Sequence, residues 1–242
     1  MEAIRIEKLT KRYGALTAVS ELELSIHGGE TFGLLGVNGA GKTTTVKMLS
    51  CLTRPDSGDA YLNGKSIVSE SAEVKSIIGV SPQETAVAPN LSVRENLEFM
   101  CGVFGFSKDK TRSKTEELIV SFDLGSVADR KAGKLSGGWQ RRLSIALALV
   151  GEPEILFLDE PTLGLDVIAR SELHDFIRSL PEEVTVVLTT HYMEEAEALC
   201  DRIGIMKEGR LIALGTVPEL CALAGKDGFE AAFVALVKGE KQ

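Results

Sequence analysis

A glycine-rich stretch near residue 40 carries residue types that can hold a phosphate group. It follows the pattern Gly-x-x-x-x-Gly-Lys-Thr from Gly36 to Thr43, between the apolar run 31–36 and a helical pattern that begins near Lys42. Glycines let the backbone bend so that successive N–H groups face one anion, and a helix start adds positive potential. Lys42 would contact the outer phosphates, and the Thr43 hydroxyl would bind Mg²⁺. The alternative is a glycine-rich turn with a chance lysine, which does not explain the position between a strand and a helix.

A pair of carboxylates follows the apolar run 155–158. Asp159 and Glu160 stand directly after Leu158. A buried strand that ends in two carboxylates must project them into a polar site, because unpaired buried charge is costly. Asp159 would hold the magnesium shell, and Glu160 would orient or deprotonate an attacking water. The competing interpretation is a helix cap or a pair of loop carboxylates, and it is weak downstream of a phosphate loop.

A second candidate anion site opens the helical stretch 139–150. Ser136, Gly137 and Gly138 precede this stretch, so small residues expose backbone N–H groups at a helix start and Ser136 adds a hydroxyl. The chain therefore has two separate helix starts suited to phosphate. A capped helix without a ligand is the alternative for this motif taken by itself.

Composition and charge limit the class of protein. The 242 residues are 44% hydrophobic and 26% charged, as in an ordinary globular chain, and the net charge of −8 argues against broad nucleic-acid binding. No stretch approaches the roughly 20 apolar residues of a membrane span, and the first residues lack the apolar core of a secretory signal. The four cysteines are far apart without a CxxC pair, which favours reduced structural thiols.

The hydrophobic patterns predict the elements that position these motifs. Alternating residues over 3–10 and 18–26 predict short strands, whereas apolar runs separated by helices predict a parallel sheet covered on both faces. The region 91–149 has helical spacing, and no proline falls between Pro89 and Pro153, so it is predicted to be an inserted helical lobe. We also expect a strand that leads into a loop over 74–83, a helix over 192–203 and a short helix in the tail.

The order of motifs resembles the ATP-binding cassette (ABC) family over nearly the whole chain. Besides the motifs above, the resemblance rests on Gln83, on Gly164-Leu165-Asp166 and on His191. It implies an α/β fold in one nucleotide-binding domain over 1–242. This fold is a RecA-like P-loop NTPase core with a small antiparallel β lobe, an inserted helical lobe at about 88–150 and a helical tail at about 226–242. It also implies two ATP molecules sandwiched between two head-to-tail copies of the chain.

The resemblance assigns roles residue by residue. Glu160, His191 and Gln83 are the implied catalytic residues, Thr43, Gln83 and Asp159 the implied Mg²⁺ site, and Asp166 the implied link between the two sites of the dimer. Implied contacts to ATP come from Tyr13, Gly36, Val37, Asn38, Gly39, Ala40, Gly41, Lys42, Thr43 and Thr44, and those to the ATP of the partner chain from Ser136, Gly137 and Gly138.

Three positions depart from the family pattern. Trp139 stands where the family has glutamine after the two glycines, Val167 replaces a common proline, and Gly164 stands where many members have serine or alanine. Spacing is kept and Ser136 and Gly138 remain, so ATPase activity is still expected.

Two stretches indicate which kind of cassette this is. Residues 81–105 and 190–216 look like the multidrug, antibiotic-resistance and sodium export group. They imply an ATP-hydrolysing subunit that powers export through a separate integral membrane permease, pairs with a second copy of itself and binds no nucleic acid. The implied location is cytoplasmic, peripheral on the cytoplasmic face of the cell membrane. The alternative is a soluble cassette ATPase, such as one for iron–sulfur cluster assembly.

Overall fold

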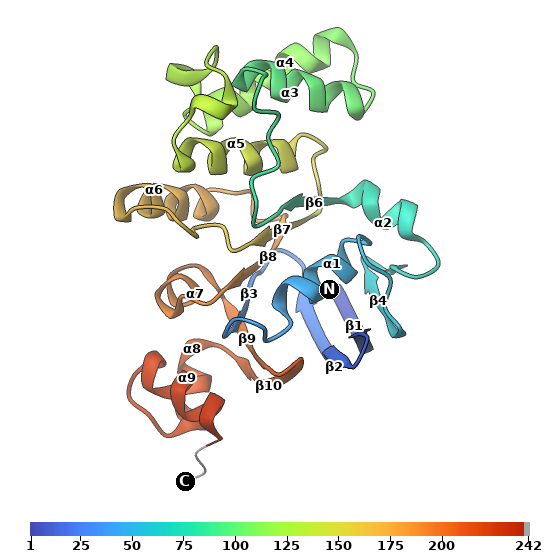
Figure 1. The fold of residues 1–242 in the computed structure, drawn as a ribbon, viewed down its shortest axis with the longest axis vertical. Coiled ribbons are helices and arrows are strands. Elements are labelled where there is room, and N and C mark those ends of the chain that lie inside the picture. Colours follow the sequence, from blue (N-terminus) through green and yellow to red (C-terminus); the bar gives the residue numbers. More distant parts are fainter. Residues whose placement is uncertain (240–242) are drawn as a thin grey trace. The chain divides into compact units, whose positions relative to one another are not determined.

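The chain divides into two compact units in the computed structural model, which describes residues 1–239 (Figure 1). Unit 1 joins Met1–Ser76 with Pro181–Gln242, and unit 2 is Ile77–Leu180. The part of the predicted helical tail beyond residue 239 lies outside the described residues.

Unit 1 contains a four-stranded antiparallel sheet in the order β2-β1-β4-β5. Its strands are β1 (Glu2–Tyr13), β2 (Leu16–His27), β4 (Ser57–Leu62) and β5 (Lys65–Ser66). One face of β1 is buried through Ile4, Ile6 and Leu9. The register shifts between Ile6 and Leu9, where Lys8 has a positive φ of 47°, so a bulge bends the strand. This sheet confirms the predicted small antiparallel lobe.

Unit 1 also contains a group of parallel strands that leads to the phosphate loop. β3 (Thr31–Gly36) pairs in parallel with both β8 (Thr185–Thr190) and β9 (Arg202–Lys207), and β10 (Arg210–Gly215) pairs antiparallel with β9. β8 is buried along its whole length, as expected for a strand with both faces covered.

Helices of unit 1 complete its core. They are α1 (Lys42–Leu49), α2 (Ser71–Ile77), α7 (Met193–Leu199), α8 (Val217–Ala224) and α9 (Phe229–Lys238). Phe229 and Phe233 of α9 pack in one apolar cluster with Leu35, Ile203 and Leu220. The C-terminal helices therefore cover the strands next to the phosphate loop.

Unit 2 combines two parallel strands with four α-helices. β6 (Ile78–Ser81) pairs with β7 (Ile155–Asp159), and the helices are α3 (Val93–Val103), α4 (Lys108–Ser121), α5 (Gly137–Leu149) and α6 (Val167–Arg178). Short 3-10 turns lie at Gly125–Val127 and Ala132–Lys134. The predicted helical lobe at 88–150 falls inside this unit, and its boundaries remain a prediction.

Two element predictions were wrong in part. Residues 74–77 end helix α2 instead of starting a strand, and the helix predicted over 192–203 ends at Leu199. At Asp201 the backbone N–H donates to Thr31 O, and the carboxylate accepts from Thr31 N, each at 2.8 Å. The chain therefore leaves the helix to pair with β3, which is a tertiary constraint that helical spacing does not reveal. The hairpin β9–β10 and helix α8 were not predicted.

Candidate active site

The phosphate loop is a tight turn between buried strand β3 and helix α1. Gly39 and Gly41 have positive φ values of 83° and 105°, and the Ala40 N–H donates to Val37 O at 3.1 Å. A Cβ atom on Gly36 would lie 2.6 Å from Met206 O, and one on Gly41 would lie 2.5 Å from Ala18 O. Both positions therefore need glycine, because any side chain would collide with backbone.

Lys42 lies over the loop that it follows. It is only 5% exposed, and its Nζ donates to Gly36 O at 2.7 Å and to Val37 O at 3.4 Å. Gly41 is the N-cap of α1 and has no side chain with which to cap the helix. The Gly209 N–H donates to Ala40 O at 3.0 Å and braces the loop from the β9–β10 turn. This arrangement concentrates positive charge and N–H donors at one helix start.

His191 follows the strand next to the phosphate loop. Thr190, the last residue of β8, pairs with Leu35, and Gly36 begins the loop one residue later. Because parallel strands end at the same edge, His191 and the loop share the carboxyl edge of this sheet. The His191 ring lies 4.1 Å from that of Tyr192, centre to centre, with 38° between their planes.

Tyr13 ends β1 before the turn at Gly14. Its side chain is 48% exposed, and Lys11 Nζ lies 5.6 Å from its ring centre. An exposed aromatic ring of this kind is available for stacking, and its assignment to adenine stays a prediction.

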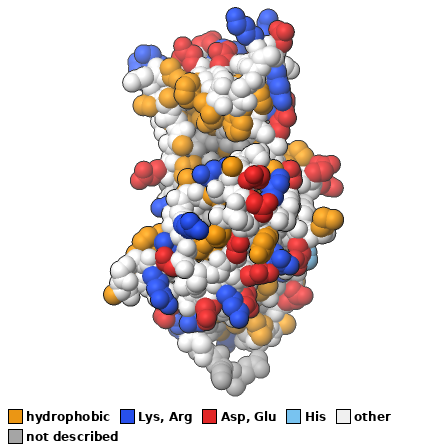
Figure 2. Space-filling view, turned by 90° about the vertical axis from the view of Figure 1, so that its right-hand side faces the viewer, with side chains coloured by type: hydrophobic (Ala, Val, Ile, Leu, Met, Phe, Trp, Pro, Cys, Tyr) orange, Lys and Arg blue, Asp and Glu red, His pale blue; other side chains and the backbone are white. Residues whose placement is uncertain are grey.

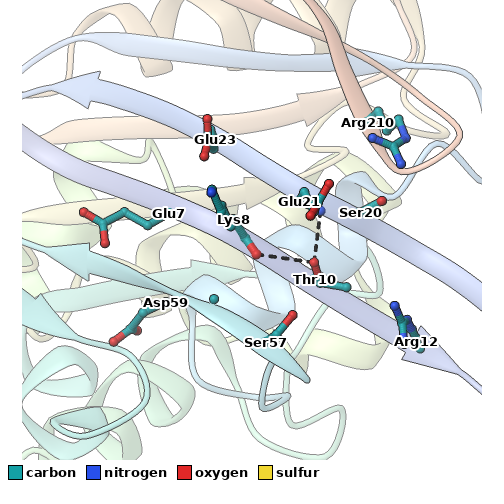
Figure 3. Close-up of a pocket in the computed structure, with 11 residues that line it drawn as sticks. Glu7, Lys8, Thr10, Arg12, Ser20, Glu21, Glu23, Ser57, Asp59 and Arg210 are labelled. Atoms are coloured by element: carbon teal, nitrogen blue, oxygen red, sulfur yellow. Dashed lines mark hydrogen bonds between the residues drawn. The ribbon is translucent and has the colours of Figure 1, made fainter.

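An open groove of about 900 Å³ lies on the antiparallel sheet of unit 1 (Figure 3). Four carboxylates line it together with three cations: Glu7, Glu21, Glu23 and Asp59, and Lys8, Arg12 and Arg210. None of the residues predicted to contact ATP lines this groove. The carboxylates make it a poor site for a triphosphate, because like charges repel.

Unit 2 brings Gln83, Asp159 and Glu160 to one edge of its strand pair. Ser81 of β6 pairs with Leu158 of β7, so both strands end at the same level. Asp159 and Glu160 are 4% and 7% exposed, whereas Gln83 is exposed. Glu160 has a positive φ of 50°, a left-handed conformation that costs a non-glycine residue about 1–2 kcal/mol. Strain of this kind at a strand end is typical of functional sites.

Arg141 holds this edge together and was missed in the sequence. It is 3% exposed on the buried side of α5, and its guanidinium donates to Pro82 O and Gln83 O at 2.6 Å each and to Glu160 O at 3.4 Å. The pattern did hold one clue. Arg141 lies three and four residues before the buried Ser144 and Ile145, so the arginine occupies the apolar face of the helix. Since a buried arginine needs partners, that position predicts a set of polar acceptors.

The start of α5 presents backbone donors. Ser136 is the N-cap, is exposed and makes no side-chain cap hydrogen bond, whereas Ser92, Ser107 and Thr216 cap their helices with their hydroxyl groups. A Cβ atom on Gly137 would meet nothing within 4 Å. This end of the helix is therefore open, and the simple capping interpretation of Ser136 does not hold.

The departures from the family pattern have local explanations. Trp139 is partly buried, and the Arg142 guanidinium lies 5.0 Å from its ring centre in a cation–π contact. Gly164 has a φ of 77°, a conformation that serine or alanine would adopt only with strain. Asp166 is the N-cap of α6 and accepts from the Ala169 N–H at 2.9 Å, while Val167 next to it is 80% exposed.

The predicted residues thus form two groups. Unit 1 holds Tyr13, the phosphate loop and His191, and unit 2 holds Gln83, the Ser136 helix start, the two carboxylates and Asp166. A phosphate loop after a parallel strand, together with a buried strand that ends in two carboxylates, defines a P-loop nucleoside triphosphatase.

Comparisons with known proteins identify the family within this class. The model of the ABC transporter family matches residues 19–163. A linearmycin resistance ATP-binding protein of Bacillus subtilis (strain 168) is 42% identical over 225 residues, which cover 93% of this chain and 72% of that protein. A Nod factor export ATP-binding protein I of Burkholderia orbicola (strain AU 1054) is 46% identical over 213 residues, covering 88% and 70% of the two chains.

Comparison with solved structures identifies the same family. The dimeric structure of a bacterial ABC transporter cassette superposes with a TM-score of 0.80 at 28% identity, covering 88% of this chain and 98% of that one. A dimeric post-hydrolysis cassette bound to ADP and phosphate gives 0.79 at the same identity and coverage. The chain belongs to the ABC transporter family and is an ATP-binding ATPase. No helix within residues 1–239 is long and apolar enough to cross a membrane.

Proposed function

We propose that this chain hydrolyses ATP to power export through a separate membrane permease, as a dimer of two copies. The observation that carries the dimer is the open helix start at Ser136, which offers N–H donors without a side-chain cap and belongs to a different unit from the phosphate loop. In this proposal each ATP lies between the phosphate loop of one copy and Ser136, Gly137 and Gly138 of the other. The dimeric cassettes among the solved relatives support this arrangement.

ATP binding is assigned to unit 1. The loop from Gly36 to Thr44 would cradle the phosphates with its N–H groups, and Lys42 would shift from its carbonyl partners toward the outer phosphates. Tyr13 would stack on adenine. Gly36 and Gly41 permit the tight turn that these contacts need, because a side chain at either position would collide with backbone.

Thr43 and Asp159 are the proposed Mg²⁺ ligands, with Gln83 reaching the same ion. They offer the oxygen donors that Mg²⁺ prefers, and Asp159 is nearly buried at a strand end. Within residues 1–239, no group of three or more His, Cys, Asp or Glu forms a ready cage. This fits an ion that takes most of its ligands from water and phosphate. Bound Mg²⁺ would neutralise charge on the phosphates.

Hydrolysis is assigned to Glu160. Its carboxylate would accept a proton from, or orient, a water in line with the γ-phosphate, and His191 and Lys42 would stabilise the developing charge. Asp159 and Glu160 are adjacent at a strand end, so both carboxylates cannot lie equally close to the metal. Asp166, at the start of α6, would link the two sites across the dimer.

The permease is proposed to dock on unit 2. Phe99, Val103 and Phe104 expose 62%, 65% and 43% of their surface at α3, and Figure 2 shows hydrophobic side chains gathered over the helices of this unit. Exposed apolar patches of this kind mark interaction surfaces. The relatives' names refer to drug resistance and Nod factor export, which favours an export permease over a role in iron–sulfur cluster assembly. Docking would hold the chain on the cytoplasmic face of the membrane.

Mixed subunits test the dimer. Ser136→Arg chains keep their phosphate loop but lose the α5 start, and Lys42→Ala chains keep the α5 start but lose the lysine of the loop. Each variant alone should therefore be inactive. A one-to-one mixture forms one intact composite site in the mixed dimers, and about a quarter of parental turnover should return. A mixture that stays as inactive as its components would contradict the dimer.

Reconstitution with the cognate permease in vesicles tests export. The proposal requires that the permease stimulate ATP turnover.

A further inference from the structure

The buried guanidinium of Arg141 makes three hydrogen bonds to backbone carbonyls, and the roles proposed above for ATP binding, Mg²⁺ binding and hydrolysis do not include this residue. Its Nη1 donates to Pro82 O at 2.6 Å, and its Nη2 donates to Gln83 O at 2.6 Å and to Glu160 O at 3.4 Å. These acceptors are backbone carbonyls just past the ends of β6 and β7. The geometry points to Arg141 as a positioning residue that fixes the backbone of Gln83 and Glu160 from helix α5. This inference rests on the proposed catalytic roles of those two residues.

The fork of an arginine is needed for this arrangement. Two consecutive carbonyls and a third from another strand end face one planar group, and a guanidinium offers five N–H donors in a fixed geometry. A lysine ammonium would put one compact charge in the same place and could not reach all three acceptors with good angles. Arg141 is 3% exposed and its bond to Glu160 O is buried, so loss of the guanidinium would take one donor from a carbonyl that water does not readily reach.

The contact with Glu160 falls on a strained turn. Glu160 is held at a φ of 50°, and its carbonyl also accepts from the Leu163 N–H at 3.2 Å. A strained conformation persists only when its surroundings over-determine it. Arg141 supplies one hydrogen bond to this carbonyl. Its removal should let the turn relax and move the Glu160 carboxylate away from the proposed position of the attacking water.

Helix α5 connects the hydrogen bonds of Arg141 to the proposed contact with the partner's ATP. Ser136 occupies the N-cap position of the helix without a side-chain cap hydrogen bond, and Arg141 follows in the second turn. One turn further, Ser144 Oγ lies 3.0 Å from Ser81 Oγ and pins the helix to the end of β6. A shift of α5 must therefore move the backbone of Gln83 and Glu160 or break these bonds.

The variants Arg141→Lys and Arg141→Met test the inference. Turnover should fall at least about tenfold for Arg141→Met and less for Arg141→Lys, because a displacement of about 1 Å in a catalytic group can cost a hundredfold. KM for ATP should stay within about threefold, since the phosphate loop is untouched. Arg178→Met is the matched control, because it removes an exposed guanidinium from the same unit and should keep parental turnover.

Mixed dimers separate positioning from general loss of structure. When Ser136→Arg and Lys42→Ala chains are mixed, the working site takes Glu160 from the Ser136→Arg chain and the α5 start from the Lys42→Ala chain. Arg141→Lys added to the Ser136→Arg chain should lower turnover severalfold, and added to the Lys42→Ala chain it should change turnover less than about twofold. Equal losses in both placements would overturn the inference, and so would no loss in either.

Hydrogen exchange keeps this test apart from the test of the dimer. Amides at 82–85 and 160–166 should exchange faster in Arg141→Lys than in the parent chain, and those at 37–45 should not change. If the plain mixture recovers no turnover, the dimer proposal fails, and this exchange pattern together with the kcat of the single variant still decides the role of Arg141. Unchanged exchange at 160–166 would overturn it.

Discussion

The phosphate loop and the carboxylate edge are stabilised in different ways. In the loop, Lys42 bonds to carbonyls six and five positions away, and the glycines that permit the turn are part of the same short stretch. At the carboxylate edge, Arg141 bonds to carbonyls 59, 58 and 19 positions away. In our proposal the loop, a local structure, binds ATP, whereas the edge, a tertiary structure, positions the groups for hydrolysis. Substitutions in the loop should therefore remove binding, and substitutions at the edge should remove turnover.

The largest expected effect is that of Lys42→Ala. It removes the positive charge over the phosphate loop, so ATP binding should weaken strongly and hydrolysis should vanish. A binding titration and a phosphate-release assay measure both. Lys47→Ala, at an exposed position on the same helix, should behave like the parent chain. Near-parental turnover in Lys42→Ala would contradict the assignment of the loop.

Asp159→Asn should change the metal dependence of binding. The amide lacks the negative charge that a hard cation prefers, so Mg²⁺-dependent ATP affinity should fall at least about tenfold. Titrations with Mg²⁺ and with a chelator separate this effect from metal-free binding, which should stay near the parental value. An unchanged response to Mg²⁺ would remove Asp159 from the proposed metal site.

Two glycine substitutions compare the packing of the phosphate loop with that of the α5 start. Gly36→Ala puts a Cβ atom 2.6 Å from Met206 O and 3.0 Å from Ala40 Cβ, and it should cost about 1–3 kcal/mol of unfolding free energy. Gly137→Ala meets nothing within 4 Å and should leave stability within about 0.5 kcal/mol. Urea denaturation measures both. Equal midpoints for the two variants would show that the loop is not tightly packed.

Tyr13→Ala should have the smallest effect. A base stacked on an aromatic ring gains roughly 1–3 kcal/mol, and Tyr13 is half exposed, so ATP affinity should fall about fivefold. Tyr13→Phe keeps the ring and should bind like the parent. If both variants bind ATP equally well, adenine does not stack on Tyr13.

Local motifs were predictable from the sequence because their geometry depends on neighbouring residues. The phosphate loop, the carboxylates after the apolar strand and the Ser136 helix start are of this kind, and the ABC fold followed from their order. Arg141 and the early end of the helix at Leu199 were not predicted, because each depends on partners far along the chain. Gln83 lies next to Glu160 in unit 2 through the pairing of β6 with β7, and no local pattern specifies that pairing.

Glu160→Gln tests most directly whether binding and catalysis are separate. The substitution keeps the shape and a hydrogen bond but removes the negative charge, so ATP should still bind and repulsion with the triphosphate should be relieved. Hydrolysis should fall by about two orders of magnitude or more, the range for losing a general base. Size-exclusion chromatography should then show a long-lived dimer with ATP and Mg²⁺ and a monomer with ADP. Hydrolysis at the parental rate, with no ATP-dependent dimer, would contradict the catalytic role of Glu160 and the separation that we propose.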